Sequence, residues 1–209
     1  MFVLSPSMKN SFQHTEMSDL ALWRLFLQGD EQAFATIFDV HSAILYRYGN
    51  AITSHSEIVE DSIQDIFIEL WNSRTRLKDT DSIRFYLFKV LRRKIYRNLD
   101  LKTDYQADFT GLIWENEGSI ENLIIDNESQ AERLKALTDA IQQLPPRQRE
   151  VIELRFYHGF SYEQIAEITE INFQSVHNNM HRALTNLRQR LPADLFVLLL
   201  SLTPFPILS

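Results

Sequence analysis

The 209-residue chain contains no cysteine, which excludes disulfide bonds and zinc sites built on cysteine. Only five glycines and six prolines interrupt it, so long stretches can form helices. No apolar run reaches the roughly 20 residues that a membrane-spanning helix needs. The first six residues lack the basic and apolar segments of a secretory signal. We therefore expect a soluble, cytoplasmic protein.

Catalytic motifs are also missing from the sequence. There is no glycine-rich phosphate loop and no nucleophile elbow. His177 and His181 stand four residues apart, but no H-E-x-x-H motif or other ligand set accompanies them. We expect neither an enzyme nor a protein that binds a cofactor or a metal.

Charge is abundant but unbalanced, with 28 acidic and 21 basic residues and a net charge of -7. Hydrophobic residues make up 44% of the chain, which is enough for packed cores and argues against global disorder. An acidic chain is, as a whole, an unpromising nucleic-acid binder. The distribution of the charges along the sequence therefore matters more than their sum.

Apolar residues recur at three- and four-residue spacing almost throughout, and alternation with a period of two is scarce, so we predict an all-α fold. The expected helices fall into two groups: residues 18–28, 30–51, 57–73 and 81–99, and then residues 128–143, 147–158, 161–169 and 172–190. Residues 103–132 contain eight acids, no Lys or Arg, and two glycines. We take residues 100–127 as an acidic linker between two small helical domains.

The predicted helix of residues 57–73 carries an acidic edge beside an apolar stripe. Glu57, Asp61, Asp65 and Glu69 recur every four residues and so line one side of the helix. Like charges at this spacing repel by a few tenths of a kcal/mol per pair. The edge is either an ordinary solvated face or a surface reserved for a basic partner.

The next predicted helix, residues 81–99, has the opposite charge. Its six cations are Arg84, Lys89, Arg92, Arg93, Lys94 and Arg97, and no acid lies among them. Basic groups gain affinity for DNA by releasing condensed counterions from phosphates. Tyr86 and Tyr96 can stack on unpaired bases. This mixture favours contact with nucleic acid, and an ordinary basic helix face is the alternative.

Residues 161–191 read as a helix-turn-helix, a device that places its second helix in the DNA major groove. Ser161 and Gln164 form a capping box for the first helix, and Asn172 can cap the second. In the second helix we expect a buried stripe of Phe173, Val176, Met180, Ala183, Leu184 and Leu187. The opposite face offers the side chains for reading DNA, Gln174, Ser175, Asn178, Asn179 and Arg182.

The two groups in this order resemble a bacterial RNA polymerase sigma factor of the sigma-70 family, most closely the small extracytoplasmic-function (ECF) group. EDSIQDIFIELW, residues 60–71, is similar to the helix that binds the polymerase clamp. SIRFYLFKVLRRKIYRNL, residues 82–99, is similar to the helix that engages and melts the promoter −10 element. LPPRQREVIELRFYHGFSYEQIAEI, residues 144–168, and the helix after it resemble the domain that reads the −35 element.

The resemblance implies a non-enzymatic factor that directs core RNA polymerase to promoter DNA and helps to open the duplex. The residues implied for polymerase binding are Asp61, Gln64, Asp65, Phe67, Ile68 and Glu69. Those implied for the −10 element are Tyr86, Lys89, Arg92, Arg93, Lys94, Tyr96 and Arg97. Those for the −35 element are Gln174, Ser175, His177, Asn178, Asn179, His181 and Arg182. Residues 74–81 would hold a flipped promoter base.

On this basis we divide the chain into an N-terminal arm (residues 1–17), a region 2-like domain (18–99), the linker (100–127), a region 4-like domain (128–191) and an apolar tail (192–209). The sequence departs from the family pattern at Tyr86, often Trp, at Arg93, often Asn, and at Glu170, usually Gly in the helix-turn-helix turn. The last departure would strain or alter the left-handed geometry of that turn.

Alternatives stay open at this point for the role of the apolar tail and for the function of the chain. The apolar tail is an extra helix packed on the second domain, a docking segment for a partner such as an anti-sigma protein, or a weak membrane contact. The chain itself is either a sigma factor or a stand-alone helix-turn-helix regulator that binds duplex operators. A module that binds only proteins is the third class of function, and it predicts no dependence on DNA.

Overall fold

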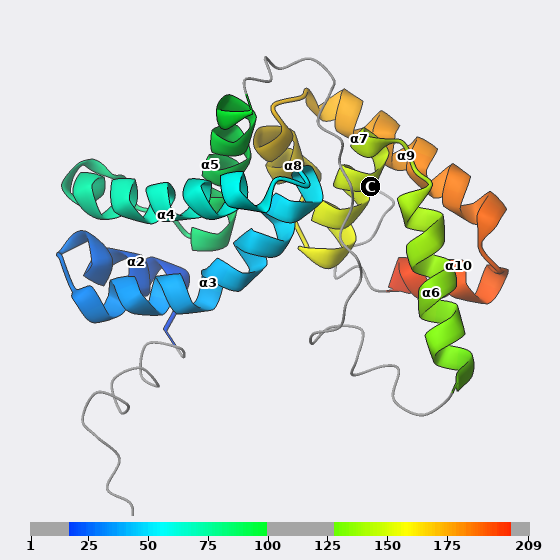
Figure 1. Ribbon diagram of the computed structural model, residues 1–209, viewed down its shortest axis with the longest axis horizontal. Coiled ribbons are helices and arrows are strands. Elements are labelled where there is room, and N and C mark those ends of the chain that lie inside the picture. The colour runs from blue at the N-terminus through cyan, green and yellow to red at the C-terminus, as the bar shows by residue number, and fades with distance from the viewer. Residues whose placement is uncertain (1–16, 100–127, 202–209) are drawn as a thin grey trace, which may run out of the picture. The chain divides into compact units, whose positions relative to one another are not determined.

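The computed structural model describes residues 17–99 and 128–201, and every regular element in these two ranges is a helix (Figure 1). The described residues confirm the prediction of an all-α fold. The chain divides into two compact units, one containing α2, most of α3, α4 and α5, and the other containing α6 to α10. Most of the expected N-terminal arm and the whole expected linker lie outside the described residues.

The helices of the first unit are α2 (Asp19–Leu27), α3 (Glu31–Ile52), α4 (Ser56–Ser73), the 3₁₀ turn η1 (Arg74–Arg76) and α5 (Ile83–Asn98). Serine side chains cap the N-termini of α2 and α5. Ser18 accepts a hydrogen bond from the Ala21 amide (3.3 Å), and Ser82 accepts one from the Phe85 amide (3.2 Å). These caps fix where α2 and α5 begin.

Aromatic side chains form much of the core of the first unit. The Phe26 ring of α2 stacks on Phe34 of α3 at a centroid distance of 5.8 Å, and Phe34 meets Phe67 of α4 at 6.0 Å. Tyr48 of α3 stacks on Phe88 of α5 at 4.7 Å. Aromatic pairs of this kind contribute about 0.5–1.5 kcal/mol beyond the area that they bury. They hold α3 against its neighbours on several sides.

Gly49 marks the closest approach of α3 to its neighbours. A Cβ atom placed there would collide with the Val59 side chain of α4 and would crowd Ile95 of α5 at 3.2 Å. Only glycine fits this position without moving α4. The tight packing brings the N-terminal half of α4 into a fixed place between α3 and α5.

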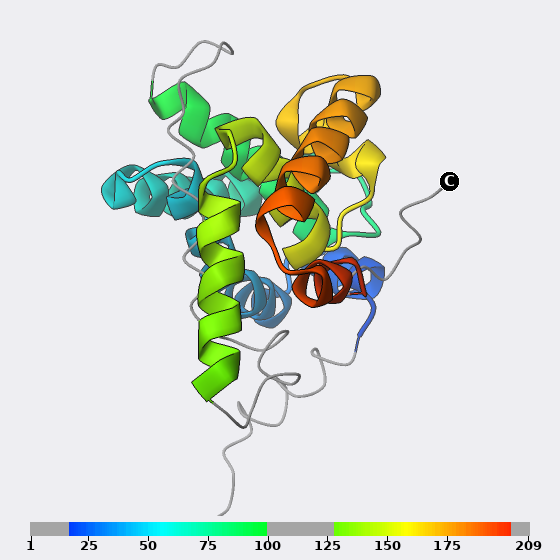
Figure 2. The ribbon, with the colours of Figure 1, turned by 90° about the vertical axis from the view of Figure 1, so that its right-hand side faces the viewer.

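The second unit comprises α6 (Glu128–Gln142), α7 (Pro146–Ile152), the π-helical turn η3 (Glu153–Tyr157), α8 (Tyr162–Thr169), α9 (Phe173–Arg190) and α10 (Ala193–Ser201). α9 is its central element, in contact with α6, α7, α8 and α10 (Figure 2). In the expected apolar stripe of α9, the side chains of Val176, Met180 and Leu187 are buried.

Phe173 does not follow the expectation for that stripe. The side chain is 46% exposed, whereas we predicted it to be buried. It is the first residue of α9, and its ring meets Tyr162 of α8 at a centroid distance of 6.3 Å without being covered. The periodicity of the sequence identifies a face but not where the packing on that face stops.

The apolar tail forms α10, which packs on α9 (Figure 2). Leu195 and Leu199 are buried, and Asp194 pairs with Arg133 of α6 at 3.1 Å. Val197 points outward with 63% of its surface exposed. Of the three alternatives for the tail, the structure therefore places residues 193–201 as an extra helix on this unit. Among the described helices, none has the length and hydropathy needed to cross a membrane.

Candidate functional site

The α4 helix carries the acidic edge predicted from the sequence. Asp61, Asp65 and Glu69 are exposed along one side of the helix, and Gln64 and Ile68 are exposed next to them. The apolar stripe of the same helix is buried, which orients the acidic edge outward. Five of the six residues predicted to bind polymerase therefore share one accessible surface.

An apolar groove of about 800 Å³ lies beside this edge, between α3 and α4. Phe67, the sixth predicted residue, is only 4% exposed and lines the groove with its ring 4.9 Å from that of Phe38. Phe38 and Ile68 are 43% and 51% exposed at the groove. Exposed apolar groups of this size mark interaction surfaces.

The contribution of α3 to the groove is a functional feature that the sequence reading missed. Phe38 and Tyr46 come from α3, and the Tyr46 hydroxyl donates a hydrogen bond to the Glu60 carboxylate of α4 (3.3 Å). Both aromatic side chains are exposed, although the helix already has a well-buried face. An excess of large apolar residues over what the core needs was the available signal.

Lys94 of α5 is placed differently from the other cations of that helix. Its side chain is 3% exposed, and its Nζ atom lies 2.6 Å from a Glu69 carboxylate oxygen and 3.3 Å from one of Asp65. The ammonium group is therefore compensated by two acids of α4. We had assigned Lys94 to DNA and Asp65 and Glu69 to polymerase, but the three side chains form one ion-pair cluster that joins α4 to α5.

The other basic residues of α5 remain at the surface or half-buried. Arg93 and Arg97 are exposed, and Lys89 and Arg92 are half-buried. The Arg92 guanidinium lies 4.3 Å from the centroid of the half-buried Tyr96 ring, a cation–π geometry. α5 therefore combines cations with an aromatic side chain, as contacts to phosphates and bases require.

Tyr86, the remaining candidate on α5, packs edge-on against Trp23 of α2 with ring centroids 5.3 Å apart. Partial burial raises the pKa of the Tyr86 hydroxyl above its ordinary value. The residue is therefore neutral at physiological pH and has one side occupied by α2.

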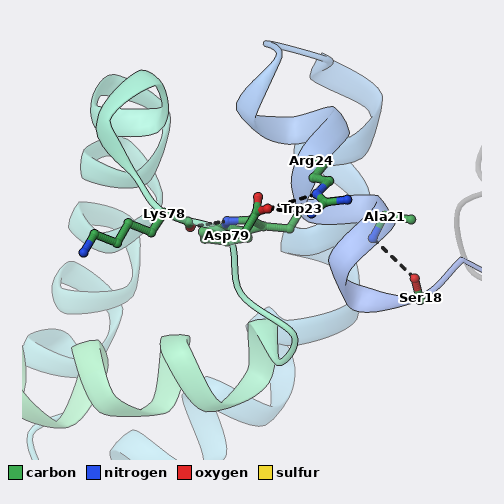
Figure 3. Close-up of polar contacts among 6 residues, drawn as sticks. All are labelled: Ser18, Ala21, Trp23, Arg24, Lys78 and Asp79. Atoms are coloured by element: carbon green, nitrogen blue, oxygen red, sulfur yellow. Dashed lines mark hydrogen bonds and ion pairs between the residues drawn. The ribbon is translucent and has the colours of Figure 1, made fainter.

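The loop between η1 and α5 is anchored to α2 (Figure 3). Trp23 donates from Nε1 to the Lys78 carbonyl oxygen (2.9 Å), and Arg24 donates from Nε and Nη2 to one Asp79 oxygen (3.0 and 2.8 Å). One turn before Trp23 in α2, Asp19 accepts a hydrogen bond from the Ile83 amide at the start of α5 (2.8 Å). α2 thus fixes the segment that we expected to hold a flipped base, a role of α2 that the sequence did not reveal.

The helix-turn-helix has the caps that its sequence predicts. Ser161 accepts from the Gln164 amide (3.2 Å) while Gln164 accepts from the Ser161 amide (2.9 Å), which completes the capping box. Asn172 accepts from the Ser175 amide (2.7 Å) at the start of α9. Glu170 adopts the left-handed conformation (φ 55°), the geometry that the turn needs and that Gly adopts more readily.

The exposed face of α9 consists of two rows at four-residue spacing: Phe173, His177 and His181, and Gln174, Asn178 and Arg182. Ser175 and Asn179 are half-buried, and the Asn179 side-chain amide donates to the Ser175 carbonyl (2.9 Å). Of the seven residues assigned to the −35 element, five therefore face outward and two lie at the edge of the face.

Neither exposed histidine of α9 belongs to a metal-binding cluster. No group of three or more potential ligand side chains suited to a metal ion occurs within residues 17–99 and 128–201. His177 instead lies beside Tyr162 of α8, with ring centroids 6.0 Å apart and the planes at 89°. The two imidazoles are therefore part of the polar face of α9.

Comparison with known proteins identifies the family of this chain. The family description "Sigma-70 region 2" matches residues 37–103, and "Sigma-70, region 4" matches residues 134–187. The ECF RNA polymerase sigma factor SigL of Mycobacterium tuberculosis is 28% identical over 155 residues, which are 73% of this chain and 85% of SigL. This chain belongs to the ECF group of the sigma-70 family. As a sigma factor it directs RNA polymerase to promoters, and it is not an enzyme.

A second sigma factor and two solved structures are also similar to this chain. ECF sigma factor SigX of Bacillus subtilis is 23% identical over 164 residues, covering 77% of this chain and 84% of SigX. Among solved structures, CnrH in complex with the cytosolic domain of CnrY is similar with a TM-score of 0.53 and 19% identity, covering 82% and 95% of the two chains. RpoE of Bartonella quintana, solved with the anti-sigma factor NepR, has a TM-score of 0.50 and 20% identity, with coverage of 78% and 97%. At this identity the two structures establish a shared fold.

Proposed function

We propose that this sigma factor docks on core RNA polymerase through the surface formed by the acidic edge of α4 and the apolar groove between α3 and α4. The carrying observation is that α4 exposes the Asp61 carboxylate and also exposes Ile68, which lines the groove together with the exposed Phe38 of α3. A helix of the polymerase that carries both basic and apolar side chains would satisfy them together.

Asp61 has a simpler role in this proposal than Asp65 and Glu69. The latter two carboxylates already pair with Lys94 inside the unit. Asp61 is exposed and lies one helical turn before Asp65 on the same edge. A charge change at Asp61 therefore tests docking without disturbing the contact between α4 and α5.

The exposed cations of α5, Arg93 and Arg97, would contact the −10 element, together with Lys89, Arg92, Tyr96 and Tyr86. Lys94 would act from inside the unit by holding α5 to α4 rather than by touching DNA. The loop fixed by Trp23 and Arg24 would receive a flipped base, and duplex opening would follow from these contacts.

The −35 element would be read by α9. Its two exposed rows supply amides, imidazoles and one guanidinium toward base edges and phosphates, with Ser175 and Asn179 at the edge of the contact. We assign this role to the unit spanning residues 128–191, and the docking and melting roles to residues 18–99. Promoter recognition with RNA polymerase would take place in the cytoplasm, where the polymerase acts.

An anti-sigma protein is a further expected partner, because RpoE of Bartonella quintana was solved in complex with the anti-sigma factor NepR. Such a protein and the polymerase would compete if both used the groove between α3 and α4.

The docking proposal is tested by Asp61→Lys and Ile68→Glu in co-elution experiments with sigma-free core polymerase. Each variant should weaken the complex about tenfold or more, the effect of losing one close charge pair or one buried apolar contact. Both side chains are exposed, so the free protein should keep its helical circular dichroism spectrum. Glu132→Lys, the same charge reversal at an exposed acid of α6, should leave the complex unchanged. Equal binding by all three variants would refute the docking surface.

A further inference from the structure

Phe173 presents an aromatic ring at the start of the recognition helix. It is the first residue of α9 and is 46% exposed. Its ring lies 6.3 Å from that of Tyr162, which in turn lies 5.2 Å from the Arg155 guanidinium. The first residues of a recognition helix are those that meet base edges in the major groove. An apolar group in this place needs an apolar partner on the DNA.

An ordered pair of amides stands beside the ring. Gln174 donates from Nε2 to Asn178 Oδ1 (3.2 Å), and both side chains are exposed. This bond uses Gln174 Nε2 as donor and Asn178 Oδ1 as acceptor, so the Oε1 atom of Gln174 and the Nδ2 group of Asn178 take no part in it. One acceptor and one donor are what the N6 and N7 atoms of adenine require.

The cations that read guanine are absent from the same part of the helix. No Lys or Arg occurs from Phe173 to His181, and Arg182 is the first cation of α9. Arg and Lys make the commonest specific contacts with guanine, whereas the thymine methyl group is the apolar feature of the major groove. The first two turns of α9 therefore suit A·T pairs, with an apolar ring for the thymine methyl group and amides for adenine.

We propose that Phe173 contacts the C5-methyl group of a thymine in the −35 element, and that Gln174 and Asn178 read an adjacent adenine. The inference rests on the proposed role of α9 in reading the −35 element. It goes beyond that role because it names the base pairs and the residue that senses the methyl group. A·T pairs should dominate where the first two turns of α9 meet the promoter.

The proposal is tested with holoenzyme formed from core polymerase and the full chain. A promoter library with a randomised −35 region first gives the preferred element. Each thymine of that element is then replaced by deoxyuridine, which removes only the methyl group. At one position the wild-type holoenzyme should bind about fourfold more weakly, the factor that corresponds to burying one methyl group. With Phe173→Ala, binding should be weaker throughout and should not change on uracil substitution at that position.

Val197→Ala is the matched control, because Val197 is an exposed apolar residue of the same unit on α10. This variant should keep the uracil effect in full. The inference is overturned if no thymine is sensitive, or if Phe173→Ala keeps the same sensitivity as the wild type. A holoenzyme that selects no −35 sequence at all would overturn the proposed function of α9 and the inference with it, so the two failures are distinguishable.

Discussion

Lys94 has a structural role on α5, the helix whose exposed arginines we propose to contact DNA. The side chain is 3% exposed between Glu69 and Asp65, whereas its neighbour Arg93 is exposed. Methionine at position 94 would keep much of the aliphatic packing and remove the charge. We expect Lys94→Met to lower the free energy of unfolding by about 1–2 kcal/mol, since the two carboxylates are more than half exposed and return to water. Urea unfolding followed by circular dichroism measures this change.

The matched variant is Arg93→Met, which removes an exposed charge from the adjacent position. It should change the free energy of unfolding by no more than about 0.5 kcal/mol and should reduce open-complex formation on a promoter. If Arg93→Met destabilises the chain as much as Lys94→Met, the division of roles on α5 is wrong.

His41 makes stability depend on pH. The residue is buried in α3, and burial lowers its pKa, with Arg84 adding to the effect and Asp19 opposing it. Below the ordinary value near 6.5, the unfolded chain therefore binds a proton that the folded chain does not. Stability should fall as the pH drops from about 6.5, by at most about 1.4 kcal/mol per pH unit from this residue. In His41→Gln that part of the decline should be absent, and unfolding curves with the same pH slope for both proteins would contradict the assignment.

Burial could be predicted from the sequence for some of the side chains of α4, α5 and α9 but not for all. The buried stripes of α4 and α9 were predictable because their apolar side chains repeat at helical spacing. Lys94 was predicted to contact DNA, whereas its side chain is 3% exposed and pairs with Asp65 and Glu69. It stands three residues after Leu91 and one before Ile95, both in the buried stripe. Composition suggested a basic face, but the spacing already placed Lys94 toward α4. The prediction for Phe173 was wrong for the opposite reason: its spacing fits the stripe, but its contact with Tyr162 leaves the side chain 46% exposed.

At the scale of elements, the turn between α8 and α9 sets the angle at which α9 is presented. Glu170 holds a left-handed conformation there, which costs a non-glycine residue about 1–2 kcal/mol. Glu170→Gly should stabilise the unit by up to about 1 kcal/mol after the greater flexibility of glycine in the unfolded chain is subtracted. Glu170→Val should destabilise it by about 1 kcal/mol or more, because a β-branched residue is strained at positive φ. Thermal unfolding midpoints in the order Gly, Glu, Val test this account, and the reverse order would contradict it.

The contact between α2 and the loop before α5 is an element-scale feature that local sequence patterns do not reveal. Trp23 and Lys78 are 55 residues apart, and so are Arg24 and Asp79. Neither pair belongs to a periodic stripe that would point to its partner. The caps, by contrast, involve residues three apart, which is why Ser161 and Asn172 could be predicted as helix starts from the sequence.

At the scale of the whole molecule, charge is sorted by helix. α4 exposes acids and α5 exposes arginines, while α9 offers a face of amides and imidazoles with few charges. This sorting explains how a chain with a net charge of -7 can act on DNA. The family was recognisable from the sequence because the segments of residues 60–71, 82–99 and 144–168 occur in the order typical of the family. The contacts within each unit could not be predicted from the sequence.

The most direct test of the account combines gel filtration and transcription with sigma-free core polymerase and a promoter library. The purified chain should co-elute with the core enzyme, and the mixture should transcribe from promoters that share two sequence elements. The chain alone should bind the same duplex DNA only weakly. Failure to co-elute, or equally tight binding to duplex DNA without polymerase, would contradict the account.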